Sequence, residues 1–219
     1  MPDSLLKQRM PVVILLVVIT IITLLDWAYT RPDYSPNPQS FMMVPTNVVE
    51  AWGNALKGDY SGRTLFDLST TLTAGFLHGN MGHLFGNMLF LWLFGVVVSE
   101  LCGWRWMVAA FLITVIGGSV GQILLDPESP IPVLGASGGL MGLMGFYFGL
   151  ALQRPRPDSH VWPLARPVNS SQLAAAGAVG VFLDFMGVID GIQGIAFGAH
   201  IGGFVTGIIL SVVADRFVR

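Results

Sequence analysis

The sequence predicts an all-α membrane protein, a bundle of six transmembrane helices. Of its 219 residues, 53% are hydrophobic and only 11% are charged, whereas a soluble domain carries about a quarter charged residues. The apolar residues form long unbroken runs rather than the alternating pattern of a barrel strand. Within lipid, runs of this kind satisfy their backbone hydrogen bonds only as helices.

Six segments are apolar enough to be membrane spans, which need about 20 mostly apolar residues. They cover roughly residues 12–29, 77–99, 104–125, 133–152, 172–189 and 195–214. The fifth segment is the weakest, because Asp184 lies within it. We expect residues 1–219 to form a single membrane domain in contact with the lipid bilayer.

The distribution of Lys and Arg predicts the orientation, because cytoplasmic segments carry an excess of basic residues. With the N-terminus inside, the inner segments hold Lys7, Arg9, Arg105, Arg154, Arg156, Arg166, Arg216 and Arg219, and the outer segments hold Arg31, Lys57 and Arg63. Both termini are therefore expected to be cytoplasmic, with a bacterial inner membrane as the expected location. The net charge of -2 gives no indication of a nucleic-acid partner.

The first outer loop, about residues 30–76, is too long for a simple connector. Its stretches Val44–Leu56 and Thr64–Leu72 are partly apolar. We expect them to form short helices that lie against the membrane surface.

Four polar side chains are expected at a similar depth in the membrane. Spans two, four and six all run from the outside inwards. Span two carries His83 and Asn87, span four carries Ser137, and span six carries His200. At a rise of 1.5 Å per residue, Ser137 and His200 both fall roughly 6–8 Å below the outer ends of their helices. Polar groups within a membrane are costly, so a shared layer of them indicates a functional site.

Glycines predict that spans four and six pack closely. Pairs with a spacing of four residues let helix backbones approach one another. In these two spans the pairs are Gly135/Gly139, Gly138/Gly142, Gly145/Gly149, Gly198/Gly202 and Gly203/Gly207. If these faces meet, Ser137 is brought towards His200.

A serine beside a histidine provides a nucleophile and a general base for acyl transfer. His83 and Asn87, four residues apart on one helix face, provide donors for an oxyanion, and the backbone N–H of Ser137 adds a third. No carboxylate that orients His200 is obvious. Asp184 and Asp190 are the candidates, and a Ser–His dyad without either is the favoured arrangement.

A metal site is the competing chemistry, with His78, His83 and His200 as ligands. The five-residue spacing of the first two turns their rings about 140° apart on a straight helix, and no H-E-x-x-H motif occurs. The single cysteine, Cys102, excludes both a cysteine-rich metal site and an internal disulfide. We expect neither a metal nor another cofactor.

These motifs together resemble the rhomboid family of intramembrane serine proteases. The resemblance runs from about Leu65 to Val213 and rests on Phe76–Met88, on Gly95, Glu100 and Gly103, on Gly135–Gly138 and on Ala199–Gly203. It implies Ser137 as the nucleophile, His200 as the base, His83 and Asn87 at the oxyanion, and His78 as a structural residue. The implied substrate is a transmembrane helix of another protein, with span five gating its access.

Two positions depart from the family pattern. Many members carry a Trp-Arg pair in the first outer loop, whereas Arg63 is here followed by Thr64. Many bacterial members also place a tyrosine four residues after the serine, where it stacks on the histidine. That position is Met141 here, whose thioether is expected to pack on the ring edge.

Two alternatives to a protease remain open. The first is a non-catalytic rhomboid-like protein that binds or escorts membrane clients, although relatives of that type lose the serine or the histidine. The second is a small channel or transporter, which the lack of repeated halves disfavours.

Overall fold

The computed structural model describes residues 3–30, 41–153, 161, 169–190, 194–214 and 216. Within these residues the regular structure is helical apart from an isolated β-bridge, so the predicted fold class is confirmed. The described residues do not include part of the predicted first outer loop or most of the inner connector. Four of the basic residues counted above, Arg31, Arg154, Arg156 and Arg166, therefore lie outside them.

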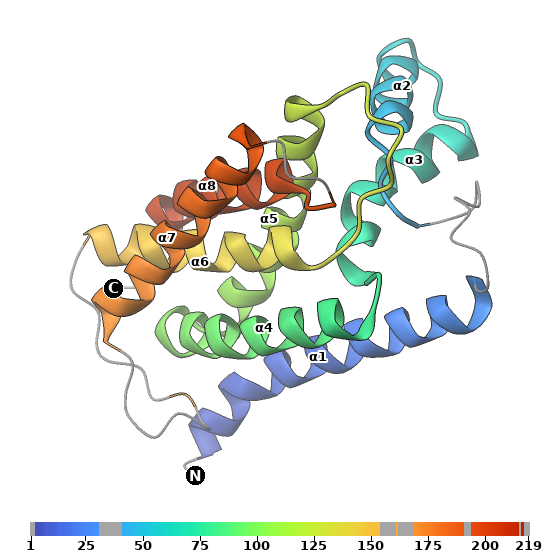
Figure 1. Cartoon of the computed structure of the whole chain (residues 1–219). Helices are drawn as coiled ribbons and strands as arrows, with labels where there is room; N and C mark the ends of the chain where they lie inside the picture. Colours follow the sequence, from blue (N-terminus) through green and yellow to red (C-terminus); the bar gives the residue numbers. More distant parts are fainter. Residues whose placement is uncertain are drawn as a thin grey trace.

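The helices follow the predicted spans, with three short elements in the first outer loop (Figure 1). In chain order they are α1 (Asp3–Thr30), α2 (Pro45–Leu56), α3 (Gly62–Thr73), the 3-10 turn η1 (Ala74–Phe76), α4 (Met81–Cys102), α5 (Trp104–Leu125), α6 (Ser137–Gln153), α7 (Ser170–Ile189) and α8 (Phe197–Ala214). Helices α2 and α3 confirm that the partly apolar loop stretches are helical; their contact with a membrane surface stays a prediction.

Five helices of the described part are long and apolar enough to cross a membrane, namely α1, α4, α5, α7 and α8. Helix α6 fills the predicted fourth span but has only 17 residues. Its length is then about 26 Å, slightly less than the hydrocarbon core of about 30 Å. The side chains of residues 138–147 are all buried, so α6 lies inside the bundle rather than facing lipid.

Helix α4 begins at Met81, four residues later than predicted. Asn80, in an extended conformation, caps the helix and accepts a hydrogen bond from the His83 N–H at 2.9 Å. Such a cap satisfies one of the amides that the first turn of any helix leaves unpaired. As a result, His78 lies in the turn before α4 rather than on the helix.

Helix α6 likewise begins late, at Ser137. The residues before it are extended, and Val133 exchanges two backbone hydrogen bonds with Met43 at 3.0 and 2.7 Å. Gly135 has a φ of +126°, a conformation that side chains disfavour. The predicted depth of Ser137 within its own helix was therefore wrong: Ser137 opens α6, and an extended segment leads the chain to it.

The predicted contact between spans four and six is confirmed, because the backbones of α6 and α8 touch at glycines. A methyl group on Gly203 would collide with the carbonyl of Gly138, and one on Gly207 with the carbonyl of Gly142. Helix α5 joins the same contact, since a methyl group on Gly121 would lie 2.6 Å from the Cα of Gly202. Helices α5, α6 and α8 therefore pack against one another at their glycines.

The termini of the described bundle lie at one end, and the first loop lies at the other. Figure 1 shows that α1 begins and α8 ends on the side of the molecule away from α2 and α3. It also shows α4, α6 and α8 running in the same direction. The first residues of α4, α6 and α8 therefore come to one end of the bundle, as the sequence predicts.

Candidate active site

Ser137 is positioned by the two residues that precede it. The N–H of Gly135 donates to the carbonyl of Ala74 at 2.9 Å, and the N–H of Ala136 donates to Nε2 of His78 at 3.4 Å. Both partners lie in the η1 turn and the segment after it. The start of α6 is thus fixed by chain that lies more than fifty residues earlier in the sequence.

His78 connects three parts of the fold. It is 1% exposed, and its Nδ1 lies 3.1 Å from the Thr23 hydroxyl, which donates to the Phe76 carbonyl at 3.1 Å. Because Nε2 accepts from Ala136, the proton of a neutral imidazole belongs on Nδ1, which then donates to Thr23. Trp27 also donates to the His78 carbonyl at 2.7 Å. His78 therefore ties α1 to the segment that carries Ser137.

His83 occupies space that a glycine leaves open beside Ser137. A Cβ on Gly135 would lie 2.8 Å from both Cε1 and Nε2 of His83, and 3.7 Å from Oγ of Ser137. The imidazole of His83 and the hydroxyl of Ser137 thus border the same small volume. His78 packs edge-on against the His83 ring with the centroids 5.0 Å apart.

Asn87 lies one turn further along α4 and is 7% exposed. Its Nδ2 donates to the His83 carbonyl at 3.0 Å. An amide nitrogen has two N–H groups, so this bond leaves the second for another acceptor. The structure brings Asn87 and His83 to one face of α4, as their spacing predicts.

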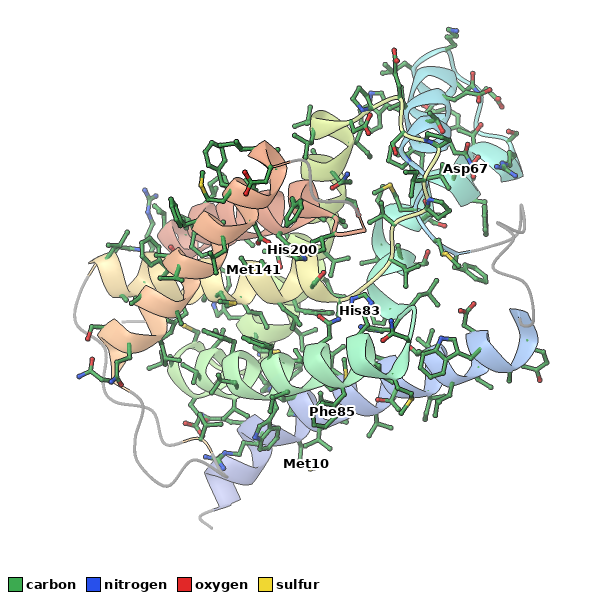
Figure 2. The ribbon with its side chains drawn as sticks, viewed as in Figure 1. Met10, Asp67, His83, Phe85, Met141 and His200 are labelled. Atoms are coloured by element: carbon green, nitrogen blue, oxygen red, sulfur yellow. The ribbon has the colours of Figure 1, made fainter. Side chains whose placement is uncertain are left out.

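His200 lies on α8 where that helix meets the start of α6. A Cβ on Gly138 would lie 3.3 Å from the carbonyl oxygen of Ala199, so the residues next to Ser137 and His200 are in contact. The side chains of Ser137 and His200 are both partly exposed. Figure 2 shows His200 near Met141, where α6, α7 and α8 pack together, and His83 at the start of α4.

The structure also provides a carboxylate at His200. Asp184 Oδ1, on α7, lies 2.9 Å from His200 Nδ1, whereas Asp190 is exposed at the end of that helix. The sequence named both residues but favoured an arrangement without either. The contact forms because α7 packs close enough to α8 for a short aspartate side chain to reach the ring.

Met141 is 8% exposed and lies one turn after Ser137. A Cβ on Gly180 of α7 would lie 3.6 Å from the Met141 Cε. The thioether is therefore covered by α7. Its packing on the ring of His200 stays a prediction.

The geometry of the histidines bears on the metal alternative. Both ring nitrogens of His78 have protein partners, Thr23 and Ala136. Among the described residues, no group of three or more His, Cys, Asp or Glu side chains is arranged to hold a metal ion.

Fold and site together define a multi-pass helical membrane protein with polar side chains gathered at one end of its bundle. A sequence model of the Rhomboid domain matches residues 66–216, and the chain belongs to this family. The match includes every candidate site residue, from His78 to His200.

Relatives of known name agree with this assignment. The chain is 29% identical to RHOMBOID-like protein 12, mitochondrial, of Arabidopsis thaliana, in an alignment that covers 62% of this chain. It is also 29% identical to Rhomboid-like protein 11, chloroplastic, of the same plant, in an alignment that covers 67% of this chain. The alignments cover 43% and 52% of these relatives, so the chain spans about half their length. It is also 25% identical to the putative rhomboid protease YdcA of Bacillus subtilis, over 78% of this chain and 79% of that one.

Proposed function

We propose that this chain is an intramembrane serine endopeptidase that hydrolyses peptide bonds in or near transmembrane segments of other membrane proteins. The observation that carries this proposal is the contact between the Gly138 and Ala199 backbones. Their sequence neighbours are Ser137 and His200. The close approach of the two helices at this level supports the proposal that the Ser137 hydroxyl and the His200 imidazole act together in nucleophilic acyl transfer.

In the proposed reaction, Oγ of Ser137 attacks the carbonyl carbon of the scissile peptide while its proton passes to Nε2 of His200. The C–N bond then breaks, and the proton passes from His200 to the leaving nitrogen. A water molecule hydrolyses the resulting ester with His200 again acting as the base, which restores the Ser137 hydroxyl. The protein thus needs no cofactor for the reaction.

The negative oxygen of the tetrahedral intermediate needs donors nearby. His83 borders the volume beside Ser137, and Asn87 has a second N–H available. Because Ser137 opens α6, its backbone N–H also has no partner within that helix. The positive end of the α6 dipole supports a negative charge at the same place. Removing one such donor typically lowers kcat roughly 100- to 1,000-fold.

The proposed substrate is a transmembrane helix, because the partly exposed Ser137 lies at one end of a bundle of apolar helices. A helix hides its peptide bonds, so residues with poor helix propensity near the cut ease the required unwinding. We propose that this end of the bundle faces outwards and that both termini are cytoplasmic. The arrangement of the described helices is compatible with that orientation, since α1 begins and α8 ends at the opposite side (Figure 1).

The test uses the purified full-length chain in proteoliposomes with a single-span substrate protein. We expect the wild type to cut the substrate near one end of its span, and Ser137→Ala to reduce cutting below detection. Ser69→Ala is a matched control, because Ser69 is an exposed α3 residue that donates only to a carbonyl of its own helix. Cutting that survives Ser137→Ala would refute the proposal.

The same experiment distinguishes the non-catalytic alternative. A wild-type chain that binds the single-span protein but leaves it intact would identify an escort rather than an enzyme. Reconstitution with the substrate in the same vesicle, followed by co-purification, measures binding and cutting in one sample.

A further inference from the structure

The contact between Asp184 and His200 extends the proposed chemistry. Their Oδ1 and Nδ1 atoms are 2.9 Å apart, and the side chains are 14% and 18% exposed, respectively. Asp184 is the only charged residue between the first and last positions of α7. A carboxylate in a membrane helix is costly and usually faces a specific partner. Here the partner is the residue proposed as the general base.

The inward face of α7 is built to bring this short side chain into reach. Gly180 and Gly187, one turn on either side of Asp184, face Met141 of α6 and the Phe197 ring of α8, respectively. A methyl group on Gly187 would collide with the Phe197 ring, whereas one on Gly180 would make an ordinary van der Waals contact with Met141. The opposite face of α7 carries exposed apolar side chains, among them Phe182, Leu183 and Phe185.

The chemistry of the two groups fixes the direction of the hydrogen bond. An ionised carboxylate has no proton to donate, so Nδ1 of His200 is the donor. The neutral imidazole then carries its proton on Nδ1, and the lone pair on Nε2 is available to a hydroxyl. When Nε2 takes a proton, the charged ring gains a charge-assisted hydrogen bond to the same carboxylate.

We propose that Asp184 is a positioning residue that holds His200 in the Nδ1–H form and stabilises its protonated state during catalysis. This inference rests on the proposed peptidase function. In acylation the proton of Ser137 moves to Nε2 of His200 and then to the leaving nitrogen, and in deacylation a proton of the attacking water moves through Nε2 back to Oγ of Ser137. Asp184 remains a carboxylate throughout and forms no bond to the substrate.

The position of Asp184 has a consequence for the coupling between helices. The nucleophile and base are on α6 and α8, which touch at their backbones, whereas the orienting carboxylate is on α7. His200 is therefore held in its productive orientation only while α7 is seated against α8.

The experiment compares Asp184→Asn with Asp184→Glu and with the control Asp190→Asn, which removes an exposed carboxylate from the end of the same helix. The full chain in proteoliposomes is assayed for kcat and KM on a single-span substrate. We expect Asp184→Asn to lower kcat about 10⁴-fold with KM changed less than about twofold, because the amide favours the wrong ring tautomer. Asp184→Glu should recover part of the loss, and Asp190→Asn should match the wild type.

An unchanged kcat in Asp184→Asn would overturn the proposal, as would an equal loss in Asp190→Asn. If Asp184→Asn does not fold, the proposal is tested on the wild-type protein by recording the ¹⁵N spectrum of its selectively labelled histidines. A His200 signal with the proton on Nδ1 supports the proposal, and one with the proton on Nε2 contradicts it. A wild type that never cuts substrate refutes the peptidase function, whereas this spectrum still tests the Asp184–His200 pairing.

Discussion

The central pair α6–α8 and the flanking helices α1 and α7 are held in the bundle in different ways. In the central pair, glycines such as Gly138 and Gly207 let the helix backbones touch. Helices α1 and α7 are the least buried of the five candidate spans, and polar side chains connect them to the rest. The core thus sets the distance between the helices that carry the proposed nucleophile and base, whereas the flanking helices supply side chains that we propose orient the site.

The polar connections of the flanking helices occur at both ends of the molecule. At one end of α1, Arg9 pairs with Glu100 of α4 at 2.6 Å, and near the other end Thr23 bonds to His78. Helix α7 has the contact from Asp184 to His200. Each connection is a small number of hydrogen bonds, so each is open to a single substitution.

The largest expected effect comes from filling a glycine of the central pair. In Gly207→Ala the new methyl group would collide with the backbone carbonyl of Gly142. We expect the free energy of unfolding in micelles to fall by about 3 kcal/mol, the upper part of the usual range for overpacking. Unfolding followed by circular dichroism during titration with denaturant measures this change.

Gly180→Ala on α7 is the matched control for that substitution. Its methyl group would meet Met141 Cε at 3.6 Å, an ordinary van der Waals distance, so we expect a change within about 0.5 kcal/mol. Equal destabilisation by the two alanines would show that α7 is packed as tightly as α8 and would remove the contrast.

A smaller loss is expected from Thr23→Val on α1. This change keeps the shape of the side chain but removes the hydroxyl between His78 Nδ1 and the Phe76 carbonyl. Leaving such buried groups unpaired costs about 1–3 kcal/mol, and the start of α6 should loosen because His78 also binds the Ala136 N–H. Thermal unfolding and substrate cutting measure the two consequences.

Thr206→Val on α8 is the control for Thr23→Val, since its hydroxyl donates to the Gly202 carbonyl of its own helix. That carbonyl lies within α8 and keeps its helical hydrogen bond, so the expected change is within about 0.5 kcal/mol. A Thr23→Val protein as stable and active as this control would mean that α1 does not support the site.

The smallest expected effect is at the Arg9–Glu100 pair, far from Ser137. Both side chains are partly accessible, at 13% and 19%, so solvent weakens the pair. A double-mutant cycle with Arg9→Met and Glu100→Gln should give a coupling of about 0.5–1 kcal/mol in unfolding free energy. Substrate cutting by the folded variants should stay unchanged; a large loss of cutting would mean that this connection also orients the site.

Much of this fold could be predicted from the sequence, because lipid leaves few options for apolar segments. The six helices and the contact between spans four and six followed from apolar runs and glycine spacing. The helix starts did not, since they depend on the cap at Asn80 and on the extended pairing of Val133 with Met43. The four-residue spacing of Gly117 and Gly121 is the signal that could have predicted the contribution of α5.

The polar partners of the site were harder to predict, because they join residues far apart in the sequence. Thr23 in an apolar run was a signal that a buried polar group needed a partner, yet nothing identified that partner as His78. Asp184 was named as a candidate, but only the packing of α7 decides whether it reaches His200. The same applies to the first loop, where Met43 anchors the chain without the expected Trp-Arg pair.

The proposed peptidase function depends most on Ser137 being activated by His200. The direct measurement is to treat the reconstituted protein with a fluorophosphonate and to locate the adduct by peptide mass spectrometry. We expect an adduct on Ser137 in the wild type and almost none in His200→Ala, although that variant keeps the Ser137 hydroxyl. An adduct on another residue, or equal labelling of Ser137 without His200, would contradict it.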